Sequence, residues 1–185
     1  MKVTIVYESM FGNTHEVAQA IGDGIRDVNS DADVQCVAVT DASPELIGST
    51  DLLVVGGPTH IRGMTSGFSR KIGVSGEEKA EAAGGPRHDL EEDAEGPGVR
   101  EWFDGLPKLK DGGQAAAFDT RLPSSMAGGA ARGIARRLRR HGYRLLSEPE
   151  GFIVDDSYGP LRSGEINRAK QWGAQLMRAS VGSSR

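Results

Sequence analysis

The chain has 185 residues, of which 37% are hydrophobic, and this is enough to bury the core of one globular domain. Its formal net charge of −4 argues against nucleic acid as the main partner, because there is no surplus of Lys and Arg to neutralise phosphates. Its single cysteine, Cys36, excludes an internal disulfide, and no apolar run is long enough to cross a bilayer.

Two local features refine this picture. Met1 and Lys2 lead directly into a predicted strand rather than into a signal sequence, so we expect a soluble, cytoplasmic protein. Cys36 falls in an apolar, strand-like run, where a buried and unreactive thiol is the expected state.

Strands and helices are predicted to alternate along the chain. The predicted strands cover residues 3–7, 34–39, 52–55 and 114–118, with a broken fifth strand over 143–146 and 151–154, and the predicted helices cover 14–27, 126–141 and 164–179. The first and third strands are almost entirely apolar, as expected for strands covered on both faces. The alternation predicts an α/β fold with a doubly wound parallel five-stranded sheet, strand order 2-1-3-4-5, in three α/β/α layers.

This strand order predicts where a ligand binds. Ligands in open α/β sheets lie beyond the carboxyl ends of the strands, at the point where the strand order reverses. That point falls between the first and third strands. The loops expected to meet there are residues 8–14, 56–65 and 119–125.

The first of these loops has the composition of an anion-binding turn. Unpaired backbone N–H groups and the positive end of the helix dipole attract a phosphate there without any cationic side chain. Ser9 and Thr14 add hydroxyl donors, Gly12 lets the backbone approach closely, and Thr14 is also a candidate N-cap. The alternative is a tight turn of another α/β protein, but such a turn rarely needs a hydroxyl at both ends and a glycine between them.

The stretch from the first strand into the first helix resembles the phosphate-loop signature of the flavodoxin family. That signature asks for aromatic, hydroxyl, small, Thr, Ala and aliphatic residues at fixed spacing, and the positions are filled by Tyr7, Ser9, Gly12, Thr14, Ala18 and Ile21. The resemblance implies the flavodoxin-like fold and FMN as cofactor, anchored by its phosphate in this loop. A P-loop NTPase is disfavoured, because the loop has no Gly-Lys-Ser or Gly-Lys-Thr.

The other two loops fit the same resemblance. Residues 56–61, Gly-Gly-Pro-Thr-His-Ile, look like the family's second flavin-contacting loop, in which the glycines would release the chain from the strand and Pro58 would fix a turn. The loop starting at Asp119 lies where the family covers the far side of the flavin ring. Both also fit plainer interpretations, since Gly-Gly-Pro is a good turn by itself, Asp119 suits a strand end and Arg121 suits a solvated surface.

The resemblance therefore implies a set of cofactor-binding residues and no catalytic or metal-ligating ones. The predicted FMN-binding residues are Ser9, Met10, Phe11, Gly12, Asn13, Thr14, Pro58, Thr59, His60, Ile61, Asp119, Thr120 and Arg121.

A single flavodoxin-like domain is expected over residues 1–180, followed by a short tail over 181–185. The stretch 73–98 is rich in Gly, Ala, Glu and Asp and has little apolar surface to bury, so we expect a flexible, solvated insertion. An acidic surface for a basic partner is the alternative interpretation. Packing is expected to resume over 99–106.

Three functions remain open from the sequence. The first is an electron carrier that passes electrons between a reductase and an acceptor protein, and it leads because no substrate-specific residue set stands out. The second is a two-electron FMN-dependent oxidoreductase of the NAD(P)H:quinone or protoporphyrinogen type. It is favoured by the positive charge that His60, Arg62 and Arg121 would bring near the flavin. The third is a binding module that kept the fold without the flavin.

Overall fold

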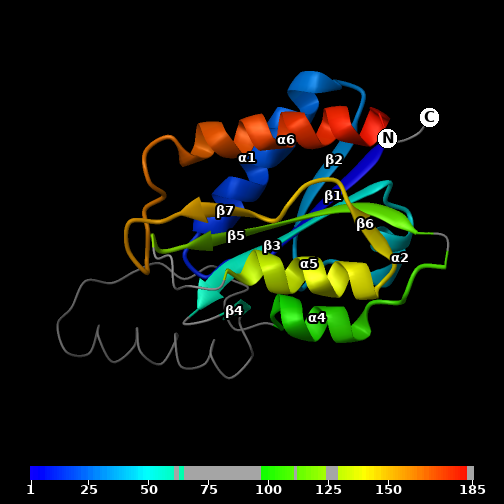
Figure 1. Cartoon of the computed structure of the whole chain (residues 1–185), viewed down its shortest axis with the longest axis horizontal. Helices are drawn as coiled ribbons and strands as arrows, with labels where there is room; N and C mark the ends of the chain where they lie inside the picture. Colours follow the sequence, from blue (N-terminus) through cyan, green and yellow to red (C-terminus); the bar gives the residue numbers. More distant parts are fainter. Residues whose placement is uncertain (61–62, 65–96, 111, 124–128, 183–185) are drawn as a thin grey trace.

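The computed structural model describes residues 1–60, 63–64, 97–110, 112–123 and 129–182. One sheet with the order β2-β1-β3-β5-β6 runs through the molecule, and β7 continues beside the end of β5 (Figure 1). The parallel strands are β1 (Lys2–Tyr7), β2 (Asp33–Ala38), β3 (Leu52–His60), β5 (Gly113–Arg121), β6 (Tyr143–Leu145) and β7 (Glu150–Ile153), and β4 (Gly63–Met64) pairs antiparallel with β3. The predicted order 2-1-3-4-5 is confirmed, with β6 and β7 as the two parts of the broken fifth strand.

Helices cover both faces of this sheet. The helices α1 (Asn13–Val28) and α6 (Glu165–Gly182) lie on one face, and α2 (Pro44–Gly48), α4 (Val99–Gly105) and α5 (Ala130–Arg140) pack on the other (Figure 1). The three-layer α/β/α architecture is therefore confirmed.

The alternation of side chains along each strand builds the two cores. Ile5 of β1 packs toward α1 and α6, whereas the next residue, Val6, packs toward the other helix layer. Val54 and Val55 of β3 divide in the same way. Since both faces are buried, the central strands have to be apolar at nearly every position, which is why they stand out in the sequence.

Two strands are longer than predicted, and this corrects the interpretation of Gly56 and Gly57. These glycines do not release the chain from the sheet, because β3 continues to His60 and pairs with β5 along Gly56–Pro58. A Cβ on Gly56 would lie 2.1 Å from the ring of Phe118, so this glycine makes room for the aromatic side chain of the neighbouring strand. Pro58 is tolerated there because β1, the neighbour on the other side, has already ended at Tyr7.

Smaller differences concern the helices. The helix predicted to begin at residue 126 begins at Ala130, because Gly129 before it has an extended backbone. Helix α2 was not predicted, although Ser43 accepts a hydrogen bond from the Leu46 N–H and Pro44 occupies the first turn, which are both start signals for a helix. The packing expected to resume over 99–106 is α4, whose Phe103 is fully buried.

Close contact between α1 and α6 depends on two glycines. A Cβ on Gly24 would lie 1.8 Å from the carbonyl oxygen of Lys170, and one on Gly173 would lie 2.1 Å from that of Ile21. The two backbones can approach this closely only because these side chains are missing. Around the contact, Ile25 and Trp172 are buried.

Cys36 in β2 tests the expectation of an unreactive thiol. Burial raises the pKa of the Cys36 thiol to about 11, although Arg26 nearby lowers it. Because only the thiolate reacts, we expect alkylation near neutral pH to be roughly 100-fold slower than for a free cysteine peptide. The rate with iodoacetamide in the folded and the urea-unfolded protein measures this, and equal rates would contradict it.

Other expectations lie outside the described residues or remain predictions. Residues 73–96 of the predicted insertion, Ile61, Arg62 and the last residues of the predicted tail are outside the described part of the chain. The extent of the predicted domain stays a prediction. None of the helices in the described ranges combines the length and the apolar character needed to cross a bilayer.

Candidate functional site

A cavity of about 270 Å³ lies beyond the carboxyl ends of β1, β3, β5 and β7. It brings together most of the predicted residues, namely Ser9, Met10, Phe11, Asn13, Thr14, Pro58, Thr59, Thr120 and Arg121. These residues come from the ends of three neighbouring strands, as expected at the point where the strand order reverses. The predicted meeting place of the three segments therefore exists as a cavity.

A larger hollow, of about 830 Å³, lies at the opposite edge of the sheet, where Gln114 and Gly113 begin β5. Ser180 and Val181, near the C-terminal end of α6, also line it. A helix C-terminus presents carbonyl groups and the negative end of the dipole, which repel a phosphate. The smaller cavity is therefore the better candidate for an anionic ligand.

The N-terminus of α1 opens onto the smaller cavity. Gly12 precedes the helix with a φ of 83°, a left-handed backbone that favours glycine, and no side chain in the described part of the chain caps the helix. The Gly12 N–H donates to the Ser9 hydroxyl at 3.1 Å. The turn thus presents the positive end of a 16-residue helix to the cavity. The acidic residue of the first turn, Glu16, is exposed and does not line the cavity.

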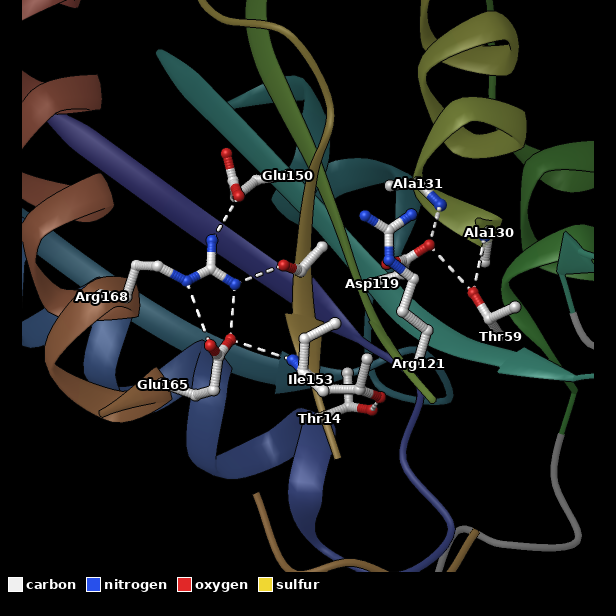
Figure 2. A network of polar contacts seen from close by, with 12 residues as sticks. Thr14, Thr59, Asp119, Arg121, Ala130, Ala131, Glu150, Ile153, Glu165 and Arg168 are labelled. Atoms are coloured by element: carbon white, nitrogen blue, oxygen red, sulfur yellow. Dashed lines mark hydrogen bonds and ion pairs between the residues drawn. The ribbon is translucent and has the colours of Figure 1, made fainter. Parts of the chain in front are cut away.

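The two hydroxyls predicted to bind phosphate have different partners. Ser9 accepts a hydrogen bond from Gly12, so its own proton remains to be donated toward the cavity. Thr14, which is labelled in Figure 2, is 2% exposed. Its hydroxyl lies 2.8 Å from the hydroxyl of Thr120. The suggestion that Thr14 caps the helix is wrong, because Thr14 lies inside α1 and its hydroxyl turns to a strand that is distant in the sequence.

The N-terminus of α5 also lies near the cavity, but protein groups already satisfy it. The Ala130 N–H donates to Thr59 Oγ1 at 2.8 Å, and the Ala131 N–H donates to Asp119 Oδ2 at 2.9 Å (Figure 2). Thr59 in turn donates its hydroxyl proton to the same Asp119 oxygen at 2.9 Å. Because a carboxylate of the protein already occupies this helix end, an added phosphate is directed to α1 instead.

The predicted binding residue Asp119 lies behind the cavity wall. Its side chain is fully buried, and it is absent from the cavity lining, where Thr59 and Arg121 lie. Its Oδ1 atom has no hydrogen-bond partner among the residues that the structure describes, but Arg121 Nε lies 3.7 Å away. In this structure Asp119 fixes the start of α5 to the end of β3.

The remaining predicted residues are placed as follows. Gly12 contributes the backbone turn before α1. His60 is the last residue of β3 and follows Thr59 in that strand. The side chain of His60 and the whole of Ile61 lie outside the described part of the structure.

One side of the cavity comes from a loop that was not predicted to reach it. Val154 and Ser157, which follow β7, line the cavity together with Leu122 of the predicted loop 119–125. The loop after β7 is held against the first loop, because Asn13 Nδ2 donates to the carbonyl oxygen of Tyr158 at 3.1 Å. Val154 directly follows β7, so the rule that ligands lie beyond strand ends would have found it once β7 was placed beside β5.

An arginine on α6 holds the strand that leads into this side of the cavity. Arg168 bonds to Glu150 (Figure 2) and to the carbonyl oxygen of Gly151. Its guanidinium lies 4.5 Å from the centre of the Phe152 ring. Glu165 accepts the Ile153 N–H at 2.9 Å. Helix α6 therefore fixes β7 just before the chain turns into the cavity wall.

Asp119 gives a prediction on pH dependence. Burial raises the pKa of its carboxyl above the usual value, against the lowering effects of Ala131, Arg121 and Thr59. The folded protein therefore binds this proton more tightly than the unfolded chain does, so Asp119 makes stability fall as pH rises between the two pKa values. Above the pKa that Asp119 has in the folded protein, the loss of unfolding free energy is complete and no longer changes with pH.

Replacing Asp119 by asparagine removes this titration and keeps an oxygen for Ala131 and Thr59. We expect the free energy of unfolding of the wild type minus that of Asp119→Asn to fall as pH rises from about 4, and then to level off. Urea unfolding of both proteins at a series of pH values measures this difference. A difference that rises with pH would contradict the assignment.

The comparisons with known proteins agree with this architecture. The sequence model described as "Flavodoxin" matches residues 5–95, which include the first loop, β3 and Thr59. The flavodoxin from the domain Archaea is 20% identical, with a TM-score of 0.63, covering 98% of this chain and 99% of its own. The chain is a flavodoxin-like protein.

Other solved structures share the fold of this flavodoxin-like protein. Oxidised flavodoxin 2 from Bacillus cereus is 16% identical with a TM-score of 0.64, covering 96% of this chain and 99% of its own. Two-electron reduced flavodoxin from Megasphaera elsdenii is 21% identical with a TM-score of 0.58, covering 95% and 98%. No curated protein sequence matches this chain significantly. At these identities the structural likeness shows the fold, and the function has to be argued from the cavity.

Proposed function

We propose that this flavodoxin-like protein binds FMN and carries electrons between a reductase and an acceptor protein. The observation that carries the proposal is the uncapped N-terminus of α1, which shares one cavity with the ends of β3 and β5. When bound, FMN supplies the redox chemistry. The protein holds the cofactor and limits its contact with water.

The residues of the first loop suit a phosphomonoester. The first amides of α1 and the Ser9 hydroxyl are donors, and the left-handed Gly12 turn lets a ligand approach the backbone. Thr14 and Thr120 share one proton between their two oxygens, which leaves the second hydroxyl proton for the ligand. The site therefore fits the group that the family resemblance implies.

The ends of β3 and β5 then hold the rest of the cofactor. Pro58 and Thr59 present a wall whose polar groups are already fixed, because the Thr59 hydroxyl both accepts from α5 and donates to Asp119. Because these side chains are already ordered, a flat ring can bind against this wall without the entropy loss of ordering them.

A second candidate function is a two-electron FMN-dependent oxidoreductase acting on a quinone or a porphyrinogen. Arg121 favours this candidate, because it places a cation in the cavity wall. A cation near the flavin ring stabilises the reduced anion and so favours two-electron reduction.

Reduction of the FMN-loaded protein distinguishes the candidates. The protein is titrated with FMN, flavin fluorescence gives the dissociation constant, and anaerobic reduction is followed in the visible spectrum. Two well-separated one-electron stages support the carrier. A single two-electron stage, with fast turnover of NAD(P)H and a quinone, supports the oxidoreductase. If the protein is colourless and leaves the fluorescence of added FMN unchanged, it is a flavin-free module with this fold.

A further inference from the structure

We propose that the solvent-exposed side of α5 is the docking surface for a redox partner with an acidic surface. This side of the helix, which we call the arginine face, consists of Arg132, Arg136, Arg139 and Arg140. Carboxylates of the partner pair with these guanidinium groups and hold the partner beside the cavity. That the partner is a redox protein rests on the proposed electron transfer, whereas the surface itself does not.

The period of the helix places these four arginines on one side of α5. With 3.6 residues per turn they fall within an arc of about 100°, and the helix rises about 12 Å from Arg132 to Arg140. All four side chains are exposed, and the buried residues of α5 lie on the other side of the helix. The arginine face is therefore one continuous strip of positive charge.

The protein does not neutralise this charge itself. The fifth arginine of the helix, Arg137, forms an ion pair with Asp104 of α4 at 3.1 Å and lies 6.0 Å from the centre of the Phe103 ring. Over the described ranges, by contrast, the side chains of the arginine face form no ion pair and no hydrogen bond. Helix α5 contains no acidic residue that could pair with them.

Helix stability does not explain the arginine face. Cations near the C-terminal end of a helix interact favourably with its dipole, which accounts for Arg139 and Arg140. Arg132 lies in the first turn, near the positive end of the dipole, where a cation is unfavourable. Arg136 is four residues from both Arg132 and Arg140, and like charges at this spacing destabilise a helix. A partner that neutralises these charges removes this unfavourable interaction.

The arginine face begins beside the candidate flavin cavity. The Ala130 N–H bonds to Thr59, which lines the cavity, and Arg132 follows two residues later. From there α5 runs back along the sheet, away from the ends of β3 and β5 (Figure 1). A partner bound along the arginine face is therefore next to the cavity, which is where it has to be to exchange electrons with a bound flavin.

The size and the surroundings of the arginine face favour a protein over nucleic acid or a membrane. The whole chain has a net charge of −4, although this 11-residue helix holds five of its 22 Lys and Arg residues. The acidic remainder repels a DNA duplex or an anionic bilayer, whose charge extends far beyond the strip. None of the exposed large hydrophobic residues in the described part lies on α5, so the helix offers no apolar anchor for a bilayer.

Cytochrome c and its succinylated form are matched probes for the test. Succinylation replaces lysine ammonium groups by carboxylates, so the two proteins carry the same haem and opposite surface charge. One reduced FMN supplies two electrons, one to each of two ferric haems, and the absorbance of ferrous haem gives the rate. In the double variant Arg136→Gln with Arg139→Gln, we expect reduction of succinylated cytochrome c to be roughly tenfold slower than in the wild type at low salt. High salt is expected to abolish this difference, and native cytochrome c is expected not to lose rate.

The matched control is Lys170→Gln with Arg178→Gln in one chain. Both residues are exposed on α6, which lies on the other face of the sheet, and their loss removes the same number of positive charges. This control is expected to keep the wild-type rate with both cytochromes. Equal losses in the two double variants would show a general charge effect and would overturn the inference. Circular dichroism checks that each variant is folded.

Calorimetric binding of succinylated cytochrome c gives a second readout that needs no flavin. The wild type is expected to bind this probe at low salt, and the α5 variant is expected to bind it roughly tenfold more weakly. If the wild type binds no FMN, the proposed function fails, but this measurement still decides whether α5 is a docking surface. The inference is overturned if the wild type does not bind the probe. Tighter binding of a short DNA duplex or of phosphatidylserine vesicles at the same salt concentration would also overturn it.

Discussion

Replacing Ser9 by alanine and Thr14 by valine in one chain is expected to weaken FMN binding by about 2–4 kcal/mol, or roughly 30-fold to 1,000-fold. Each substitution removes a hydroxyl near the uncapped end of α1. Hydrogen bonds to a charged group contribute more binding energy than bonds between neutral groups. The loss of both hydroxyls therefore weakens the binding of a phosphate strongly. Fluorescence titration with FMN measures the change.

Thr4→Val is a matched control for Thr14→Val. The Thr4 hydroxyl lies 2.6 Å from that of Thr50, and Thr4 is 3% exposed, so this pair resembles the Thr14–Thr120 pair. Thr50 lines the hollow at the opposite edge of the sheet. Thr4→Val is therefore expected to lower stability by a similar amount and to leave the FMN affinity unchanged. If Thr4→Val and the chain with Ser9→Ala and Thr14→Val lose the same FMN affinity, the effect comes from folding. The hydroxyls of Ser9 and Thr14 are then not part of the phosphate site.

Replacing Gly24 by alanine is expected to lower the free energy of unfolding by about 2–4 kcal/mol. The new Cβ would lie 1.8 Å from the carbonyl oxygen of Lys170, which belongs to the backbone of α6. A backbone atom cannot turn away as the end of a flexible side chain can, so α1 and α6 have to separate. That separation loosens the packing around Ile25 and Trp172. Denaturant unfolding followed by circular dichroism measures the loss.

Gly22→Ala is the control in the same helix. A Cβ on Gly22 would meet its nearest neighbours, side-chain atoms of Arg26, Val34 and Cys36, at 3.4 Å, which is ordinary contact. Alanine is a better helix former than glycine, so Gly22→Ala is expected to be neutral or to stabilise by about 0.5–1 kcal/mol. Similar unfolding curves for the two variants would contradict the close packing of α1 against α6.

The sequence alone was sufficient for the order of strands and helices. Strands such as β1 and β3 are buried on both faces, so their residues are apolar at nearly every position, and this pattern is visible without a structure. The first loop is equally local, because its glycine, its hydroxyls and the helix that follows are adjacent in the chain. The phosphate end of the proposed site could therefore be predicted.

The positions where β3 and β5 end were not visible in this way. Gly56 and Gly57 have the composition of a turn, and only the Phe118 ring on the neighbouring strand explains why the chain stays extended there. Asp119 is a residue type that is expected to bind a ligand at a strand end. One of its oxygens, however, accepts hydrogen bonds from Thr59 and from the first turn of α5. Each of these outcomes depends on a residue that is distant in the sequence.

The fold and the loop proposed to bind phosphate could be predicted from the chain alone, because both depend on periodicity and on neighbouring residues. The packing of distant elements was needed to show that Thr14 pairs with Thr120, that Asp119 is buried outside the cavity lining, and that Arg121 belongs to that lining. A polar side chain near a strand end has several possible partners. The nearest donor or acceptor is chosen by the packing of other strands and helices, which local sequence does not encode.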